Sequence, residues 1–254
     1  MNDAAQVRRQ VWFLLLAVVA LYGLLRLSLG PLPQNPAYHL LADRRVCALV
    51  PHAGDVITNF AILLAGMFGL SLRPRMGVVP EAGAAVNVLI AASILTAFGS
   101  AYYHWAPTNA TLVWDRLPMA IVLMSLLVLV MADRVHPLFA RAALWPFTAL
   151  GILSVIVWSV SEAMGQGDVL LYLIVRIGTA IAIVLLLVLR PPQRMGSMWL
   201  VAALVCEVVM AFFQHFDHEL FRATRGLVSG HNMKHVMAGV ALAFVFCWLR
   251  SRPR

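Results

Sequence analysis

The stretch Val169 to Leu189, VLLYLIVRIGTAIAIVLLLVL, decides the fold of this chain. A helix needs about 20 mostly apolar residues to cross roughly 30 Å of hydrocarbon, and this stretch reaches that length. It carries a single charged side chain, Arg176. The stretch is therefore predicted to be a transmembrane helix.

The composition extends this prediction to the whole chain. Of its 254 residues, 62% are hydrophobic and 12% are charged, and its mean hydropathy is +0.86. Such a chain cannot hide its apolar surface in a water-soluble core, which indicates an integral membrane protein. The net charge of +8 comes from arginines in short connections between apolar runs. Arginines in such connections are explained better by the orientation of the chain in the membrane than by binding to nucleic acid. We therefore expect no nucleic-acid partner.

Seven further apolar stretches resemble the first in length and composition. They predict an all-α, polytopic membrane helix bundle. The eight predicted spans are Val11 to Leu29, Asp55 to Leu72, Ala85 to His104, Leu112 to Met131, Ala142 to Val160, Val169 to Leu189, Met198 to Phe216 and His231 to Leu249.

The distribution of basic residues predicts an orientation. If eight spans alternate, the basic residues favour one side by roughly two to one, which the positive-inside rule assigns to the cytoplasm. Both termini are then cytoplasmic. That side carries Arg8, Arg9, Arg73, Arg75, Arg134, Arg141, Arg190, Arg194, Arg250, Arg252 and Arg254.

Three histidines indicate a metal site. His231 and His235 are four residues apart, so they share one face of the last predicted helix, and Ser100 and His104 share a face of the third. The predicted topology brings these helix ends to the same outer face. Three imidazoles would make a zinc site with one open position, which is the catalytic form of zinc.

The chemistry of such a site follows from its residues. Zinc on three neutral imidazoles lowers the pKa of bound water towards ~7. Asp115, in the first turn of the fourth span, could orient that water and take its proton, and Ser100 could donate a hydrogen bond to the oxyanion. This set predicts metal-assisted hydrolysis of an amide or ester; no organic cofactor is indicated.

These residues resemble the signature of the alkaline ceramidase family. The matching elements are Ser100-Ala-Tyr-Tyr-His104, then Asp115, then His231-Asn-Met-Lys-His235. The family belongs to a superfamily of seven-helix membrane hydrolases and receptors that includes the adiponectin and progestin receptors. The resemblance implies a seven-helix hydrolase domain over residues 55–254, preceded in residues 1–54 by an extra transmembrane helix and an outer loop.

The same resemblance implies the site and the substrate. His104, His231 and His235 would bind Zn²⁺, with Ser100 and Asp115 beside the metal-bound water, and the substrate would be the amide of a ceramide-like membrane lipid. The family's acidic calcium-binding segment is not evident here, because Asp43 to Asp55 holds two arginines and few carboxylates. We therefore do not expect a full Ca²⁺ site. The compact, arginine-rich loops favour a bacterial inner membrane with the zinc near the outer face.

Other interpretations of the same residues remain. An ester or other acyl lipid hydrolase would use the same site, and a receptor-like lipid-binding protein would keep the zinc for structure. A lone histidine in a membrane helix often makes a hydrogen bond to a neighbouring helix. Haem ligation by His231 and His235 is a weaker alternative. Carboxylates between the apolar runs, among them Asp168 and Asp217, are expected to be solvated.

Overall fold

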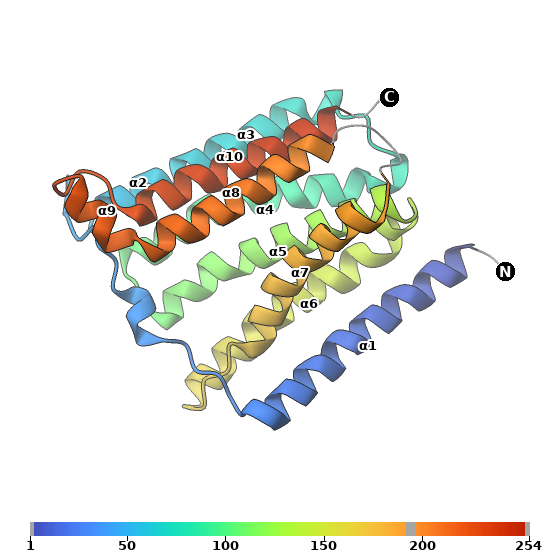
Figure 1. The fold of residues 1–254 in the computed structure, drawn as a ribbon, viewed down its shortest axis with the longest axis horizontal. Coiled ribbons are helices and arrows are strands. Elements are labelled where there is room, and N and C mark those ends of the chain that lie inside the picture. The colour runs from blue at the N-terminus through green and yellow to red at the C-terminus, as the bar shows by residue number, and fades with distance from the viewer. Residues whose placement is uncertain (1–2, 192–196, 252–254) are drawn as a thin grey trace. The chain divides into compact units, whose positions relative to one another are not determined.

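The computed structural model describes residues 3–191 and 197–251, and this part of the chain is all-α (Figure 1). Eight of its helical segments are long and apolar enough to span a membrane, which confirms a polytopic bundle. The eight candidate spans are Asp3–Leu29, Ala53–Arg75, Pro80–Trp105, Asn109–Arg134, Phe139–Ala163, Leu170–Leu189, Ser197–His215 and Gly230–Arg250.

The predicted spans are confirmed one by one. Most of the helices are longer at one end or both than predicted. The residues become more polar at a membrane boundary, but the helical backbone hydrogen bonds continue past it. The α-helices are α1 (Asp3–Leu29), α2 (Ala53–Thr58), α3 (Phe60–Leu72), α4 (Gly83–Trp105), α5 (Asn109–Arg134), α6 (Phe139–Ala163), α7 (Leu170–Leu189), α8 (Ser197–His215), α9 (Asp217–Ala223) and α10 (Gly230–Arg250). Arg194, Arg252 and Arg254 of the predicted charge pattern lie outside the described residues.

Backbone contacts divide the helices into two groups. The first group holds α1, α6, α7, the beginning of α4 and α5 from Met119 onward. Within it, α1 packs against α6 and α7. Only 6% of the most apolar window of α1 is buried inside the protein, so most residues of this helix are available for contact with lipid.

Asp168, between α6 and α7, anchors α1 to the rest of this group. Its carboxylate accepts hydrogen bonds from the hydroxyl of Tyr22 (3.0 Å) and the backbone N–H groups of Leu32 and Leu170, and it pairs with the Nε of Arg26 at 2.9 Å. The expectation that Asp168 is solvated is wrong, since the residue is 3% exposed. This carboxylate can be buried because four donors satisfy it. They come from α1, from Leu32 just after α1, and from α7.

The Asp168→Ala variant is expected to lower the free energy of unfolding by about 2 to 3 kcal/mol, because buried backbone donors lose their acceptor. Unfolding in mixed detergent micelles measures this. The control is Glu219→Ala, since the Glu219 pair with Arg222 is exposed on both sides and worth little. An Asp168→Ala protein as stable as the control would contradict the anchoring role.

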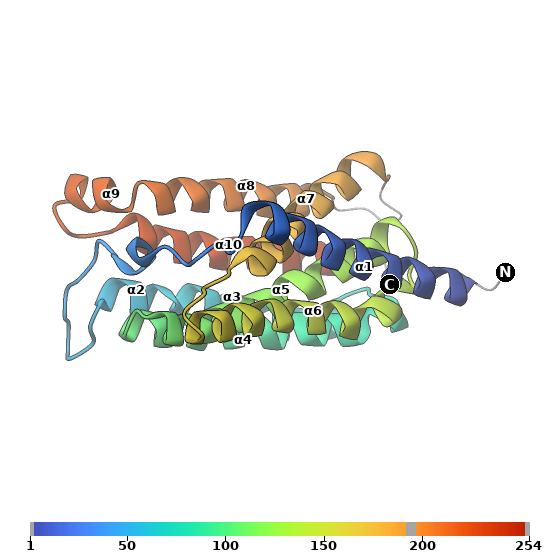
Figure 2. The same cartoon turned by 90° about the horizontal axis from the view of Figure 1, so that it is seen from below.

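The second group holds the helices that carry the predicted site. It contains α2, α3, α8, α9 and α10, with α4 from Ile90 and α5 up to Pro118. Helix α10 lies between α3 and α8 and contacts both (Figures 1 and 2). Glycines permit this packing: a Cβ at Gly239 of α10 would overlap the backbone of Ala61, and one at Gly69 of α3 would overlap the ring of Phe246.

Candidate metal centre

The first turn of α10 is fixed by a capping box. Ser229, the N-cap, accepts a hydrogen bond from the backbone N–H of Asn232, and the Asn232 side chain accepts one from the backbone N–H of Ser229. The Asn232 amide also donates to the carboxylate of Asp55 on α2 at 2.6 Å. This cap sets the backbone from which His231 projects.

Asp217 adds a second constraint on the same turn. Its carboxylate accepts a hydrogen bond from the backbone N–H of His231 at 2.7 Å and another from Ala42 at 3.0 Å. Asp217 is 5% exposed, so the prediction of a solvated side chain is wrong for this residue too. A carboxylate near a helix N-terminus meets the unpaired N–H groups there, which explains its burial.

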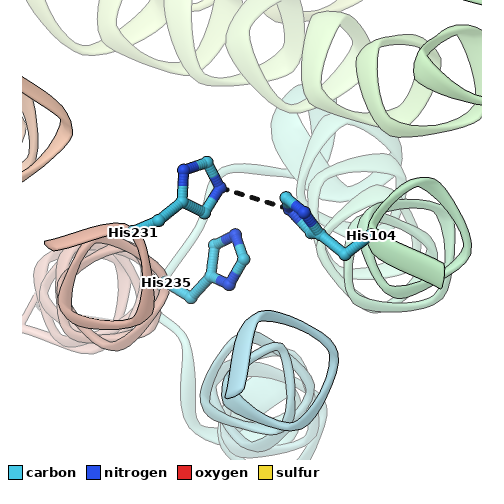
Figure 3. Close-up of side chains that lie close together, drawn as sticks. All are labelled: His104, His231 and His235. Atoms are coloured by element: carbon cyan, nitrogen blue, oxygen red, sulfur yellow. Dashed lines mark hydrogen bonds between the residues drawn. The ribbon is translucent and has the colours of Figure 1, made fainter. Parts of the chain in front are cut away.

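The three predicted histidines converge on one point (Figure 3). The ring centroids lie 4.7 Å apart for His104 and His231, 4.7 Å for His104 and His235, and 4.8 Å for His231 and His235. One ligand atom from each residue lies within 4.8 Å of the other two. All three side chains are buried, at 1% to 2% exposure.

This arrangement fits a metal ion. The Nε2 atoms of His104 and His231 are 3.3 Å apart. Two nitrogen ligands about 2.05 Å from a tetrahedral ion stand about 3.3 Å apart. A hydrogen bond between two rings would also give this distance, but it does not account for a third imidazole at equal spacing. His104, His231 and His235 therefore form a cluster that could hold a metal ion.

Ser100 lies on the helix that carries His104, and Asp115 lies on the helix that follows it. Ser100 is buried one turn before His104 on α4, and Asp115 is buried in the second turn of α5. Gly99 brings the two helices together, because a Cβ there would overlap the carbonyl oxygen of Trp114. The roles of Ser100 and Asp115 in catalysis remain predictions.

Polar and aromatic side chains support the α4 ligand. The two ring nitrogens of His39 lie 3.0 Å from the hydroxyl of Tyr103 and 2.9 Å from the side-chain oxygen of Asn109. The Tyr103 ring in turn lies 4.7 Å from the ring of His104. His39, in the segment between α1 and α2, thereby ties this segment to the end of α4 that carries the predicted ligand His104.

The segment before α2 contains an ion pair between the buried carboxylate of Asp43 and the exposed side chain of Arg45. The Nε and Nη2 of Arg45 donate to the two carboxylate oxygens of Asp43 at 2.8 and 2.6 Å, and Nη2 also donates to the carbonyl of Leu227. Burial raises the pKa of Asp43, but the side-chain and backbone hydrogen bonds from Arg45 outweigh it, so this pKa lies below its usual range. Both carboxylate oxygens thus have a cationic partner within the chain.

A hollow opens next to Asp217. It has a volume of about 310 Å³, and Tyr38, Leu41, His215 and Asp217 are among the residues that line it. One of these lining residues, Asp217, also accepts the hydrogen bond from the backbone N–H of His231, a predicted ligand.

Sequence reasoning gave no role at the cluster to the polar residues around the three histidines, although Thr58-Asn59 resembles a Ser-Asn pair of the ceramidase family. Asp55 and Asn59 are buried, and Thr58 is half-buried, at the start of an otherwise apolar span. Polar residues in a membrane helix are costly and usually have a partner, which was the available signal. The Ser229 to Asn232 spacing was a second signal, since it matches a capping box.

Comparison with known proteins adds no family assignment. No protein-family model matches the chain, and no curated protein sequence is significantly similar to it. The resemblance to alkaline ceramidases therefore stays a prediction that depends on the quoted residues.

Proposed function

We propose that this protein is a zinc-dependent membrane hydrolase that cleaves the amide bond of ceramide-like lipids. The observation that carries the proposal is the triangle of three buried imidazoles, His104, His231 and His235, at equal spacing on α4 and α10. Three imidazoles leave one position of a tetrahedral ion open, as in catalytic zinc sites.

In the proposed reaction, metal binding, proton transfer and stabilisation of the carbonyl oxygen are assigned to different side chains. His104, His231 and His235 would hold the zinc, which would act as a Lewis acid that lowers the pKa of water and polarises the substrate carbonyl. The Asp115 carboxylate accepts the proton of the attacking water and returns it to the amine that leaves. The Ser100 hydroxyl donates a hydrogen bond to the carbonyl oxygen as it gains charge, a contribution typically worth about 3 kcal/mol.

The position of the ligands supports a lipid substrate. His104 is the next-to-last residue of α4, and His231 is the second residue of α10, so the cluster lies at the ends of membrane spans. A lipid amide at headgroup depth lies at the same level of the membrane as such a site. With both termini cytoplasmic by the positive-inside rule, the cluster faces the outer side of what we propose to be a bacterial inner membrane.

The decisive experiment measures hydrolysis and metal content together. Purified protein is incubated in micelles with a ceramide and with a matched acyl ester, and the released fatty acid is quantified. We expect about one zinc per chain and release from the ceramide. Preferred release from the ester would redirect the proposal to an acyl ester hydrolase.

A third outcome separates the enzyme from a receptor-like protein. A zinc-replete sample that is inert towards both lipids would contradict the hydrolase and favour a protein that keeps zinc for structure. A sample that binds no zinc would remove the basis of either function.

A further inference from the structure

We propose that Thr58 is a positioning residue that holds His235 in the tautomer required for metal binding. This inference rests on the proposed metal site. Thr58 is the last residue of α2, and its hydroxyl oxygen lies 3.0 Å from the Nδ1 atom of His235 on α10. Thr58-Asn59 resembles a Ser-Asn pair of the ceramidase family, but that resemblance gave Thr58 no contact with a predicted ligand.

The neighbouring acceptors decide the direction of this hydrogen bond. The Thr58 hydroxyl has one hydrogen, and the carbonyl oxygen of Gly54 lies 2.8 Å away, with that of Asp55 at 3.3 Å. A carbonyl can only accept, so the hydroxyl hydrogen points to these carbonyls. The hydroxyl oxygen therefore accepts from His235, and the proton of this imidazole resides on Nδ1.

A proton on Nδ1 leaves the lone pair of Nε2 free for a metal. An uncharged imidazole carries one proton, so the hydrogen bond made by one nitrogen fixes which nitrogen can be a ligand. His235 contributes one ring nitrogen to the cluster with His104 and His231. The hydrogen bond to Thr58 also restrains rotation of the ring, so the ligand is oriented before an ion arrives.

The other two ligands lack an equivalent support. The Nδ1 atoms of His104 and His231 are buried without a hydrogen-bond partner among residues 3–191 and 197–251. His231 is instead fixed through its backbone, by Asp217. Within the described chain, Thr58 is thus the side chain that fixes a ligand ring of this cluster through its second nitrogen.

The test compares zinc affinities of the full-length protein and three variants in detergent. A chromophoric chelator competes for zinc at fixed pH. Loss of a hydrogen-bond partner behind a metal ligand typically costs about 10- to 100-fold in affinity, which we expect for Thr58→Val. The Thr58→Ser variant keeps the hydroxyl and should retain the affinity of the unmodified protein.

Thr96→Val is the matched control. The Thr96 hydroxyl donates to the carbonyl of Ala92 at 2.8 Å, so it makes the same bond within its helix as Thr58, but it is eight residues before His104. This is about 12 Å along the axis. We expect its zinc affinity to be unchanged, which isolates the contact with His235 from a general loss of a helix hydroxyl.

A spectroscopic readout tests the tautomer itself. In the ¹⁵N spectrum of histidine-labelled, zinc-loaded protein, Nδ1 of His235 should carry the proton, and Thr58→Val should shift its resonance while Thr58→Ser should not. Equal zinc affinities of Thr58→Val and the unmodified protein would overturn the proposal for Thr58 and leave the metal site standing. Absence of zinc binding by the unmodified protein would overturn both.

Discussion

The His104→Ala variant is expected to lose the bound zinc and, with it, the stability that zinc confers. His104 is the ligand contributed by α4, and the remaining two, His231 and His235, are both on α10. Two imidazoles on one helix do not enclose an ion. In the unmodified protein, free zinc at a thousand times its dissociation constant should stabilise the fold by about 4 kcal/mol. Thermal unfolding in micelles, with zinc or with a chelator, measures the difference.

The control for this loss is His218→Ala, because His218 is exposed and is not one of the three clustered histidines. Its zinc content and its zinc-dependent shift in melting temperature should match those of the unmodified protein. Acidification should also release the ion from the unmodified protein, since imidazole ligands must be uncharged to bind a metal. A His104→Ala protein that still holds one zinc per chain would refute the three-histidine site.

The Asp115→Asn variant is expected to lower kcat for ceramide hydrolysis by about 100-fold or more while zinc stays bound. An amide cannot accept the proton of the attacking water, and loss of a general base typically costs 10²- to 10⁴-fold. Gly99 allows α5 to approach α4 at Trp114, and a change from carboxylate to amide keeps this packing. Fatty acid release at saturating substrate, with zinc measured on the same sample, tests the role.

Asp133→Asn provides the matched control on the same helix. Asp133 is the other carboxylate of α5, lies near its far end and pairs with Arg134 at 3.2 Å. This change is expected to reduce stability but not kcat per folded molecule. If Asp115→Asn kept full kcat, another group would have to accept the proton; if it lost zinc, Asp115 would act on the metal centre rather than on water.

The fold could be predicted from hydropathy because the bilayer imposes a simple rule. A stretch such as Val169 to Leu189 must pair its backbone N–H and C=O groups within itself when it crosses the bilayer. Length and composition therefore suffice to place a helix. The same rule says nothing about the loops. Asp168 and Asp217 both follow apolar runs and were expected in water, yet the structure buries them. Their burial depends on donors that come from distant segments.

The ligand cluster was predictable for a different reason. The four-residue spacing of His231 and His235 fixes their common face, and alternation of spans brings His104 to the same end. The supporting contacts were not predictable, since the hydrogen bond between Thr58 and His235 joins residues 177 apart in sequence. Such pairs depend on how α2 lies along α10, which no local pattern encodes.

The separation of the ligands along the chain has a consequence for biogenesis. His104 precedes His231 by 127 residues, and both ligands of α10 belong to the last span. A nascent chain that has inserted α4 still lacks two of the three predicted ligands, His231 and His235, until the ribosome has translated the beginning of α10. For the proposed metal site, loading is therefore expected to be a late step in synthesis, because polypeptides that terminate before Gly230 would lack two of the three predicted ligands.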